Sequence, residues 1–256
     1  MTYKYSVFLP TIKGNIEEEW KQCLKQILKV RDSGYSAVRL TIFTDSNDLE
    51  TYVSDRQFIL DSVIYEFSNE TPAATGVGVR YGGVILDFCA IEIGESTNIE
   101  PVDNPDQINA YSYGQNVLMG FGDKRKTIKH PPQFERGILL VNDSYSALLI
   151  SGTASIRGQE TIGKEDIEKQ TILTIENIKK VSDSAKISKL VSGTPVCKEK
   201  FYRLRIYIKR QKDFKIVRMI CDRYFQGIPA VYVEADICRD DLLIEIEAES
   251  LFDCTE

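Results

Sequence analysis

The sequence contains two copies of one half-domain, and this repeat constrains the fold more than any other feature. Three pairs of segments recur in the same order: 24–30 with 175–181, 39–43 with 203–207, and 71–74 with 228–231. The repeat period is far longer than that of solenoid arrays, so it indicates a duplicated domain. A duplicated fold has a seam between its copies, and ligand sites form preferentially at such seams.

The composition is that of an ordinary globular protein with a sizeable core. Of 256 residues, 43% are hydrophobic and 27% are charged, which fits one large or two small domains. A net charge of -6 argues against a nucleic-acid partner, and the short basic run at 124–129 is interpreted as a solvated loop. Since no apolar stretch could span a membrane and the N-terminus has no signal-peptide pattern, we expect a cytoplasmic protein without membrane contact.

Cysteine and histidine usage narrows the chemistry. The six cysteines have no metal-type spacing, so we expect reduced, mostly buried thiols and no metal site. His130 is the only histidine, which removes most hydrolase triads from consideration. It lies in a Lys-His-Pro-Pro loop, where a surface histidine is favoured over a lone general base. Acid or base chemistry is therefore expected to rest on carboxylates, without a cofactor.

Hydrophobic periodicity predicts an α+β fold. Amphipathic helices are predicted at about 16–31, 49–67, 164–181 and 213–225. Strands are predicted at 37–43, 84–93, 138–141, 147–151, 204–208, 231–235 and 243–248. We therefore predict two tandem domains, 1–125 and 126–256, each a mixed sheet with helices on one face. The segment 94–132 has no clear hydrophobic period and is interpreted as a long connector between the halves.

One candidate site segment is 149–156, Leu-Ile-Ser-Gly-Thr-Ala-Ser-Ile, a strand that becomes small and polar. Gly152 would let a ligand approach the backbone, and Thr153 and Ser155 can donate hydrogen bonds from a rigid element. A tight strand end with a β-bulge is an equally good interpretation.

A second candidate is the strand at 243–248. Strict alternation sends Glu245 and Glu247 to one face, and the apolar residues around them cannot all share the other. One glutamate could therefore point into a partly apolar cleft, where its charged form is disfavoured and it can act as a general acid. The alternative is a strand whose polar side chains face solvent.

Three other side chains could contact a ligand. Arg239 precedes the second candidate strand, where it either forms an ion pair or holds a substrate carboxylate bidentately. Tyr111 and Tyr113 lie in the long connector and could stack on a flat ligand or fill the seam.

These segments resemble the chorismatases, which are two-domain members of the YjgF/Rid superfamily. In the second half the resemblance rests on 151–161, 170–171, 174–178, 232–239 and 243–247. Upstream it rests on 72–78, 104–113 and 134–136.

The resemblance implies a chorismate mutase-like fold repeated twice. It also implies a cleft that binds chorismate, or a related carboxylated cyclic enol ether, and releases the enolpyruvyl group as pyruvate. By this analogy Glu245 protonates the enolpyruvyl methylene, and Gly152 and Ala154 line the pocket. Cys238 resembles the branch that forms 3-hydroxybenzoate. The superfamily further implies a homo-oligomer such as a homotrimer.

The sequence departs from the family at the arginines. Ser112 stands where the family pattern Ala-Tyr-Arg-Tyr has one, and the family's Arg-x-Trp-Asn-Tyr segment has no counterpart, because Trp20 is the only tryptophan. The chain is also shorter than a typical chorismatase. Loss of a carboxylate clamp would cost roughly 2 to 5 kcal/mol. The candidates to replace it are Arg136, Lys209, Arg218 and Arg239.

Two other functions stay open at this point. Ser112 favours a non-catalytic protein that kept the fold and binds a small aromatic or keto acid. Glu245 favours a Rid-like enamine or imine deaminase, but Ala230 and Val231 stand where such enzymes carry an arginine. The fold cannot choose among these functions, because function must be argued from the site.

Overall fold

The structure is a computed structural model, which describes residues 2–11, 13–45, 71–92, 94, 97–118, 131–142, 145–191 and 196–254. His130, the basic run at 124–129 and the predicted helix at 49–67 lie outside these residues. Within them, no helix is both long enough and apolar enough to cross a membrane.

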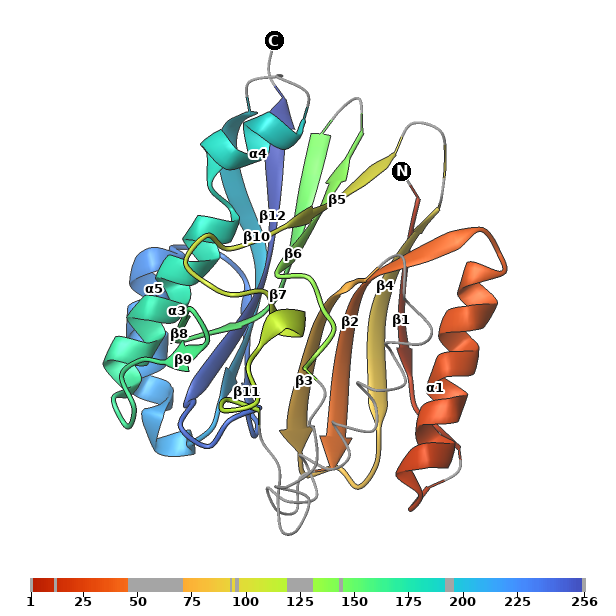
Figure 1. The fold of residues 1–256 in the computed structure, drawn as a ribbon, viewed down its shortest axis with the longest axis horizontal. Helices are drawn as coiled ribbons and strands as arrows, with labels where there is room; N and C mark the ends of the chain where they lie inside the picture. The colour runs from red at the N-terminus through yellow and green to blue at the C-terminus, as the bar shows by residue number, and fades with distance from the viewer. Residues whose placement is uncertain are drawn as a thin grey trace.

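Two mixed sheets face each other, and the helices lie on their outer faces (Figure 1). The first sheet has the order β1-β4-β2-β3, with β1 Tyr3–Phe8, β2 Tyr35–Asp45, β3 Ala73–Val79 and β4 Ile85–Glu92. The second has the order β11-β10-β12-β7-β6-β5. Its strands are β5 Asn98–Val102, β6 Gly137–Val141, β7 Tyr145–Ala154, β10 Val196–Ile208, β11 Ala230–Glu234 and β12 Ile244–Cys254. A small hairpin joins β8 Ile156–Arg157 to β9 Glu160–Thr161.

The helices are α1 Ile16–Arg31, α3 Ile167–Val181, α4 Ser184–Leu190 and α5 Phe214–Tyr224, with short 3-10 turns η1 Ala110–Ser112 and η3 Gln211–Asp213. Three of the predicted helices, at about 16–31, 164–181 and 213–225, are present as α1, α3 and α5, and α4 was not predicted. The side chain of Asn15 accepts a hydrogen bond from the Glu18 N–H and so caps the start of α1. Trp20 of α1 is fully buried in a cluster with Leu40 of β2. On the other side of the molecule, α3 buries Ile175 against the second sheet.

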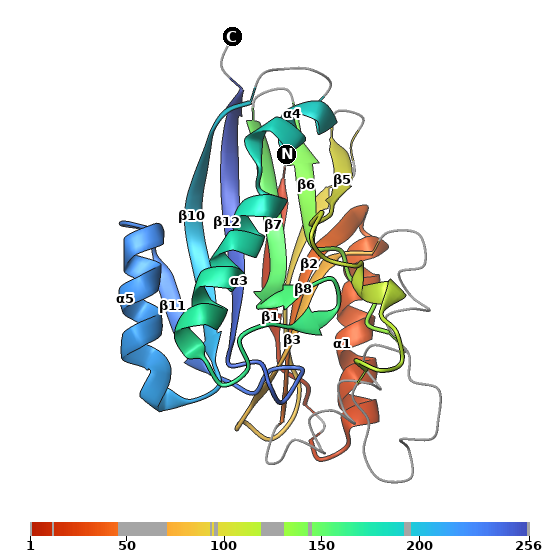
Figure 2. The ribbon, with the colours of Figure 1, turned by 60° about the vertical axis from the view of Figure 1, so that its left-hand side comes forward.

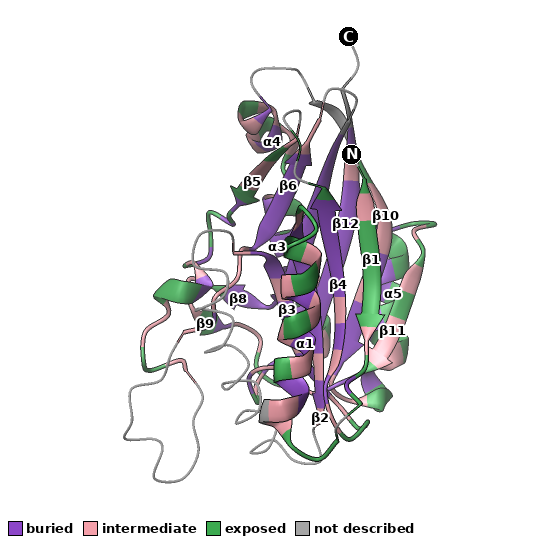
Figure 3. Ribbon diagram, turned by 90° about the vertical axis from the view of Figure 1, so that its right-hand side faces the viewer, coloured by how far each residue is buried: buried purple, intermediate pink, exposed green. Residues whose placement is uncertain are grey.

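The repeat predicted from the sequence appears as a repeated sheet topology. The series β1-β4-β2-β3 and β7-β12-β10-β11 each have two antiparallel pairs followed by one parallel pair. The ladders of β2 and β10 are irregular at matching places, just before Arg39 and Arg203. The exposed edge strand β1 is visible beside β4 in Figure 3.

One element of the predicted connector is a strand. Residues 98–102 form β5 and pair with β6 at the edge of the second sheet, so the interpretation of 94–132 as a connector was wrong there. The signal was weak because β5 contains Pro101, which only an edge strand tolerates. The division at residue 125 stays a prediction, and β5, which it assigns to the first domain, lies in the second sheet.

A layer of buried charges joins the inner faces of the two sheets. Arg39 of β2 pairs with Glu249 of β12, and Arg205 of β10 pairs with Asp87 of β4 at 2.6 Å. Burial alone would lower the pKa of Arg39, but nearby Glu247, Glu249 and Asp87 raise it, so the guanidinium stays charged. Asp87 contacts both Arg39 and Arg205, and Glu249 contacts both Arg39 and Arg203. The layer is therefore a connected network that fixes how the sheets meet.

Candidate active site

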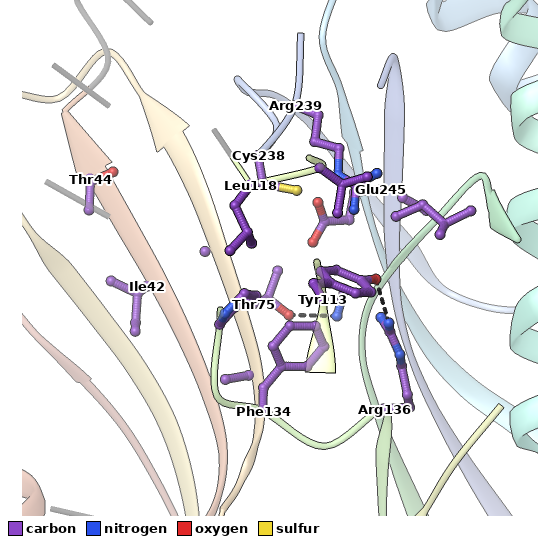
Figure 4. Close-up of a pocket in the computed structure, with 17 residues that line it drawn as sticks. Ile42, Thr44, Thr75, Tyr113, Leu118, Phe134, Arg136, Cys238, Arg239 and Glu245 are labelled. Atoms are coloured by element: carbon purple, nitrogen blue, oxygen red, sulfur yellow. Dashed lines mark hydrogen bonds between the residues drawn. The ribbon is translucent and has the colours of Figure 1, made fainter. Parts of the chain in front are cut away.

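A pocket lies where β3 of the first sheet meets β7 and β12 of the second (Figure 4). Seven of the nine side chains predicted from the sequence line it: Tyr113, Arg136, Gly152, Ala154, Cys238, Arg239 and Glu245. These residues come from distant parts of the sequence, and the pocket lies at the seam that the repeat predicted.

Glu245 is turned inward. It is 6% exposed, and it lies on the face of β12 that meets the first sheet, as do Glu247 and Glu249. The intervening Ile246 packs on the opposite side in the cluster that contains α3. Glu245 and Glu247 therefore share a face, as the alternation predicted, and of the three glutamates Glu245 lines the pocket.

Glu247 has a different environment from Glu245. Its carboxylate accepts hydrogen bonds from the Thr41 hydroxyl at 2.7 Å and the Tyr207 hydroxyl at 2.9 Å. Burial and the nearby Glu247 raise the pKa of Tyr207 well above its ordinary value, so Tyr207 remains a donor. Glu247 is therefore committed to the layer between the sheets, which leaves Glu245 as the carboxyl that a ligand can meet.

Gly152 lies against Glu245 because of a β-bulge. The β7–β12 ladder pairs Ile246 with Thr153 and Ala248 with Ile150, so Ser151 and Gly152 together oppose one residue of β12. A Cβ added at Gly152 would lie 1.8 Å from Oε1 of Glu245. The β-bulge interpretation is therefore confirmed, and glycine makes room for the carboxyl. The approach of a ligand at Gly152 stays a prediction, and the hydroxyls of Thr153 and Ser155 donate to the carbonyls of Ser151 and Ile162 and do not line the pocket.

Tyr113 lies between two arginines. The Cζ of Arg136 is 5.6 Å from the centre of the Tyr113 ring, and that of Arg239 is 5.2 Å from it. Arg136 also donates to the Tyr113 hydroxyl at 2.6 Å, as Figure 4 shows. Both arginines are buried, at 5% and 8% exposed.

Each arginine has a buried nitrogen with no hydrogen-bond partner among the described residues. These atoms are Nε of Arg136 and Nη2 of Arg239. An unpaired buried N–H is costly, and a carboxylate is the partner that satisfies guanidinium groups best. The two arginines are therefore equipped to hold anionic groups at this end of the pocket.

The segment that carries Tyr113 is fastened to the second half of the chain. The Gln107 side chain donates to the carbonyl of Ile156 at 3.0 Å, and the Gly114 N–H donates to Oε1 of Gln159 at 2.8 Å. The carbonyl of Gln159 in turn accepts from Nη1 of Arg239 at 2.7 Å. Gln159 thus sets Tyr113 and Arg239 relative to each other.

Two predicted residues lie outside the pocket. Tyr111 lies in the turn η1 and is 39% exposed, and its hydroxyl accepts a hydrogen bond from the side chain of Asn109. Arg218 lies on α5 with its side chain 60% exposed, beside Asp222 at 3.5 Å. Ser112 is exposed and does not line the pocket. Lys209 does not line it either, and its ammonium donates to the carbonyl of Asp240.

Sequence reasoning missed several residues of this pocket, among them Thr75, Leu118 and Phe134. The hydroxyl of Thr75 on β3 accepts a hydrogen bond from the Gly152 N–H at 2.7 Å, and Phe134 and Leu118 add apolar walls. The only signal for Thr75 was its place in the segment 72–78, which carried the family resemblance. Across the described residues, no group of three or more His, Cys, Asp and Glu side chains could hold a metal ion.

Comparison with known proteins identifies relatives for most of the chain. No family model matches it. The chain is 32% identical over 184 residues to a 3-hydroxybenzoate synthase of Streptomyces hygroscopicus, covering 70% of this chain and 50% of that protein. It is 31% identical over 179 residues to a chorismatase of Streptomyces rapamycinicus, covering 69% and 50%. The chain thus spans about half the length of the curated relatives it matches.

A solved structure extends the similarity to nearly the whole chain. The fold matches the crystal structure of a chorismatase with a TM-score of 0.75 and 24% identity, covering 96% of this chain and 74% of that one. This match shows that the two-sheet α+β fold predicted from the sequence is shared with that protein.

Proposed function

Because this chain is chorismatase-like in sequence and fold, we propose that it removes the enolpyruvyl group of chorismate, or of a related carboxylated cyclic enol ether, as pyruvate. The observation that carries the proposal is the inward-facing Glu245, held against Gly152 in a pocket at the seam between the two sheets. A carboxyl in such a place can deliver a proton to a carbon atom that water would not protonate.

In the proposed reaction, the Glu245 carboxyl protonates the methylene carbon of the enolpyruvyl group. The electron pair of that double bond forms the new C–H bond, and the ether oxygen stabilises the resulting cationic carbon. Water or a hydroxyl of the ring then attacks this carbon. With water, the adduct is a hemiketal: its hydroxyl proton passes to the ring oxygen as the bond between that oxygen and the former enolpyruvyl carbon breaks, pyruvate leaves, and the proton released by the attacking water returns to Glu245. With the ring hydroxyl, the adduct is a cyclic ketal: the bond from the attacking oxygen to its ring carbon breaks as the ring loses a proton and becomes aromatic, Glu245 regains a proton, and the hemiketal so formed releases pyruvate in the same way.

The arginines supply the binding part of the proposal. Arg136 and Arg239 would each donate charge-assisted hydrogen bonds to a substrate carboxylate, and Tyr113 would cover one face of the ring. They take the place of the family arginine that is missing at Ser112. We expect a 3-hydroxybenzoate-type product, because Cys238 lines the pocket and one of the relatives is a 3-hydroxybenzoate synthase.

The two alternatives fit the pocket less well. For the imine-hydrolysing function, Ala230 and Val231 lie on the edge strand β11 and do not line the pocket. For the binding protein, the missing arginine at Ser112 is offset by Arg136 and Arg239. A cytoplasmic location and assembly into a homotrimer stay proposals that rest on the sequence.

The test is an assay of pyruvate release from chorismate, coupled to lactate dehydrogenase. The wild-type protein is expected to release pyruvate and the Glu245→Gln variant to release none above blank. Glu234→Gln, a substitution at an exposed glutamate of β11, should match the wild type. If the wild type binds chorismate by calorimetry but releases no pyruvate at high protein concentration, the protein is a binding module.

A further inference from the structure

Helix α3 has a buried polar stripe that the proposed reaction does not use. Gln170, Thr174 and Asn177 are spaced by four and three residues, so they share one side of the helix, and all three are 0% exposed. Buried polar side chains destabilise a fold unless they are hydrogen-bonded. The side-chain amides of Gln170 and Asn177 form hydrogen bonds with backbone groups next to the pocket.

Gln170 holds the segment that leads into Glu245. Its Oε1 accepts from the N–H of Leu243 at 2.8 Å, and its Nε2 donates to the carbonyls of Asp241 at 2.7 Å and Gly163 at 3.2 Å. Leu243 precedes the first residue of β12, so the sheet does not satisfy its N–H. One amide therefore fixes the backbone between Arg239 and Glu245.

Asn177 holds the end of β7, whose residue Ala154 pairs with Glu245 in the β7–β12 ladder. Its Nδ2 donates to the carbonyls of Ala154 at 2.9 Å and Ile156 at 3.0 Å, where β7 ends and β8 begins. Ala154 lines the pocket and lies two residues after Gly152. Figure 2 shows α3 lying along the face of β7 and β12.

We propose that Gln170 and Asn177 are positioning residues, which fix the backbone around the pair that Glu245 of β12 forms with Ala154 of β7. They lie seven residues apart on one rigid helix, about 10 Å along its axis, so α3 ties the segment that leads into β12 to the end of β7. This inference rests on the proposed function of Glu245. A displacement of about 1 Å at a reacting group can cost roughly 100-fold in rate.

The experiment compares Gln170→Met with Thr171→Val. Methionine keeps the length of glutamine but removes all three of its hydrogen bonds. Thr171 is the next residue of the same helix, equally buried, and among the described residues its hydroxyl donates to the carbonyl of Ile167, within α3 itself. Both variants thus lose a buried polar group of α3, but only Gln170→Met releases the segment before Glu245.

Three quantities are measured: kcat for pyruvate release, the exchange rate of the Leu243 amide, and the rate at which iodoacetamide modifies Cys238. Mass spectrometry of the Cys238 peptide distinguishes this thiol from the others. For Gln170→Met we expect kcat to fall at least tenfold, the Leu243 amide to exchange at least tenfold faster, and Cys238 modification to change severalfold. Thr171→Val should stay within twofold of the wild type in all three.

Asn177→Leu gives a second test, with an expected tenfold loss of kcat and unchanged Leu243 exchange. The proposal is overturned if Gln170→Met matches Thr171→Val in kcat, or if both variants alter the site equally through a general loosening of α3. If the wild type itself releases no pyruvate, the proposed function fails. Amide exchange and Cys238 modification then still decide whether Gln170 positions this segment.

Discussion

Substitution of Gly152 by alanine tests the site at its tightest contact. The new Cβ would lie 1.8 Å from Oε1 of Glu245 and 2.6 Å from Cγ2 of Thr75. The carboxyl must then move by roughly 1.2 Å to reach the 3.0 Å below which Cβ contacts are essentially never seen. Because a shift of about 1 Å can cost roughly 100-fold in rate, we expect a loss near 2.7 kcal/mol in transition-state stabilisation.

The stability of this variant should change much less than its activity. The Glu245 carboxyl ends a side chain that can rotate away, so overpacking should cost only about 1 kcal/mol, or about 2 to 4 °C in Tm. The measurements are kcat/KM for pyruvate release and the thermal midpoint. Gly94→Ala is the matched control, because its Cβ would meet nothing within 4 Å. If Gly152→Ala turns over as fast as Gly94→Ala, the assignment of Glu245 and Gly152 to one site is refuted.

Two further predictions concern charge. Arg136→Met should lower kcat/KM about 30-fold, or about 2 kcal/mol, mainly by raising KM. The control Arg218→Met should leave kcat/KM unchanged. Equal effects of the two substitutions would contradict the assignment of Arg136 to the pocket. Burial raises the pKa of Glu199 from 4.5 to about 7. Between these pH values the folded protein keeps a proton on Glu199 that the unfolded chain has lost, so this contribution to the free energy of unfolding is present below pH 4.5 and lost as the pH rises to 7. Because Glu199 is only partly buried, solvent reduces the effect, and Glu199→Gln should raise the free energy of unfolding by about 1 to 2 kcal/mol at pH 8 and by less at pH 5. Denaturant titration at the two pH values measures this difference. An equal gain at both pH values would contradict the raised pKa.

Local patterns predicted the parts of the fold whose side chains alternate or recur with a clear period. Glu245 and Glu247 were placed on one face because a strand alternates strictly, and the burial of Ile175 followed from helical spacing. The strand β3 was missed because Ala73–Val79 is made of small residues and glycines, which resemble a loop more than a strand. Its neighbours Arg39 to Asp45 of β2 provide the pairing that makes it a strand.

The pocket could be predicted only in part, because contacts between the two sheets leave no local pattern. Nothing around Thr75 indicates that its hydroxyl meets the Gly152 N–H, 77 positions away. Likewise, Tyr111 and Tyr113 look equivalent in the sequence, and only the turn η1 separates the exposed ring from the one between the arginines. The buried amides of α3 lie in segments that carry the family resemblance, but their hydrogen bonds depend on the folded backbone.

The central claim is that Glu245 delivers a proton to the enolpyruvyl methylene, and the most direct test is turnover in heavy water. Pyruvate released from chorismate is trapped at once as lactate, so that its methyl group cannot exchange with solvent. The lactate is then analysed by mass spectrometry and NMR. The account predicts one deuterium in the methyl group with the wild-type protein and no lactate with Glu245→Gln. Lactate without deuterium, or undiminished formation by Glu245→Gln, would contradict it.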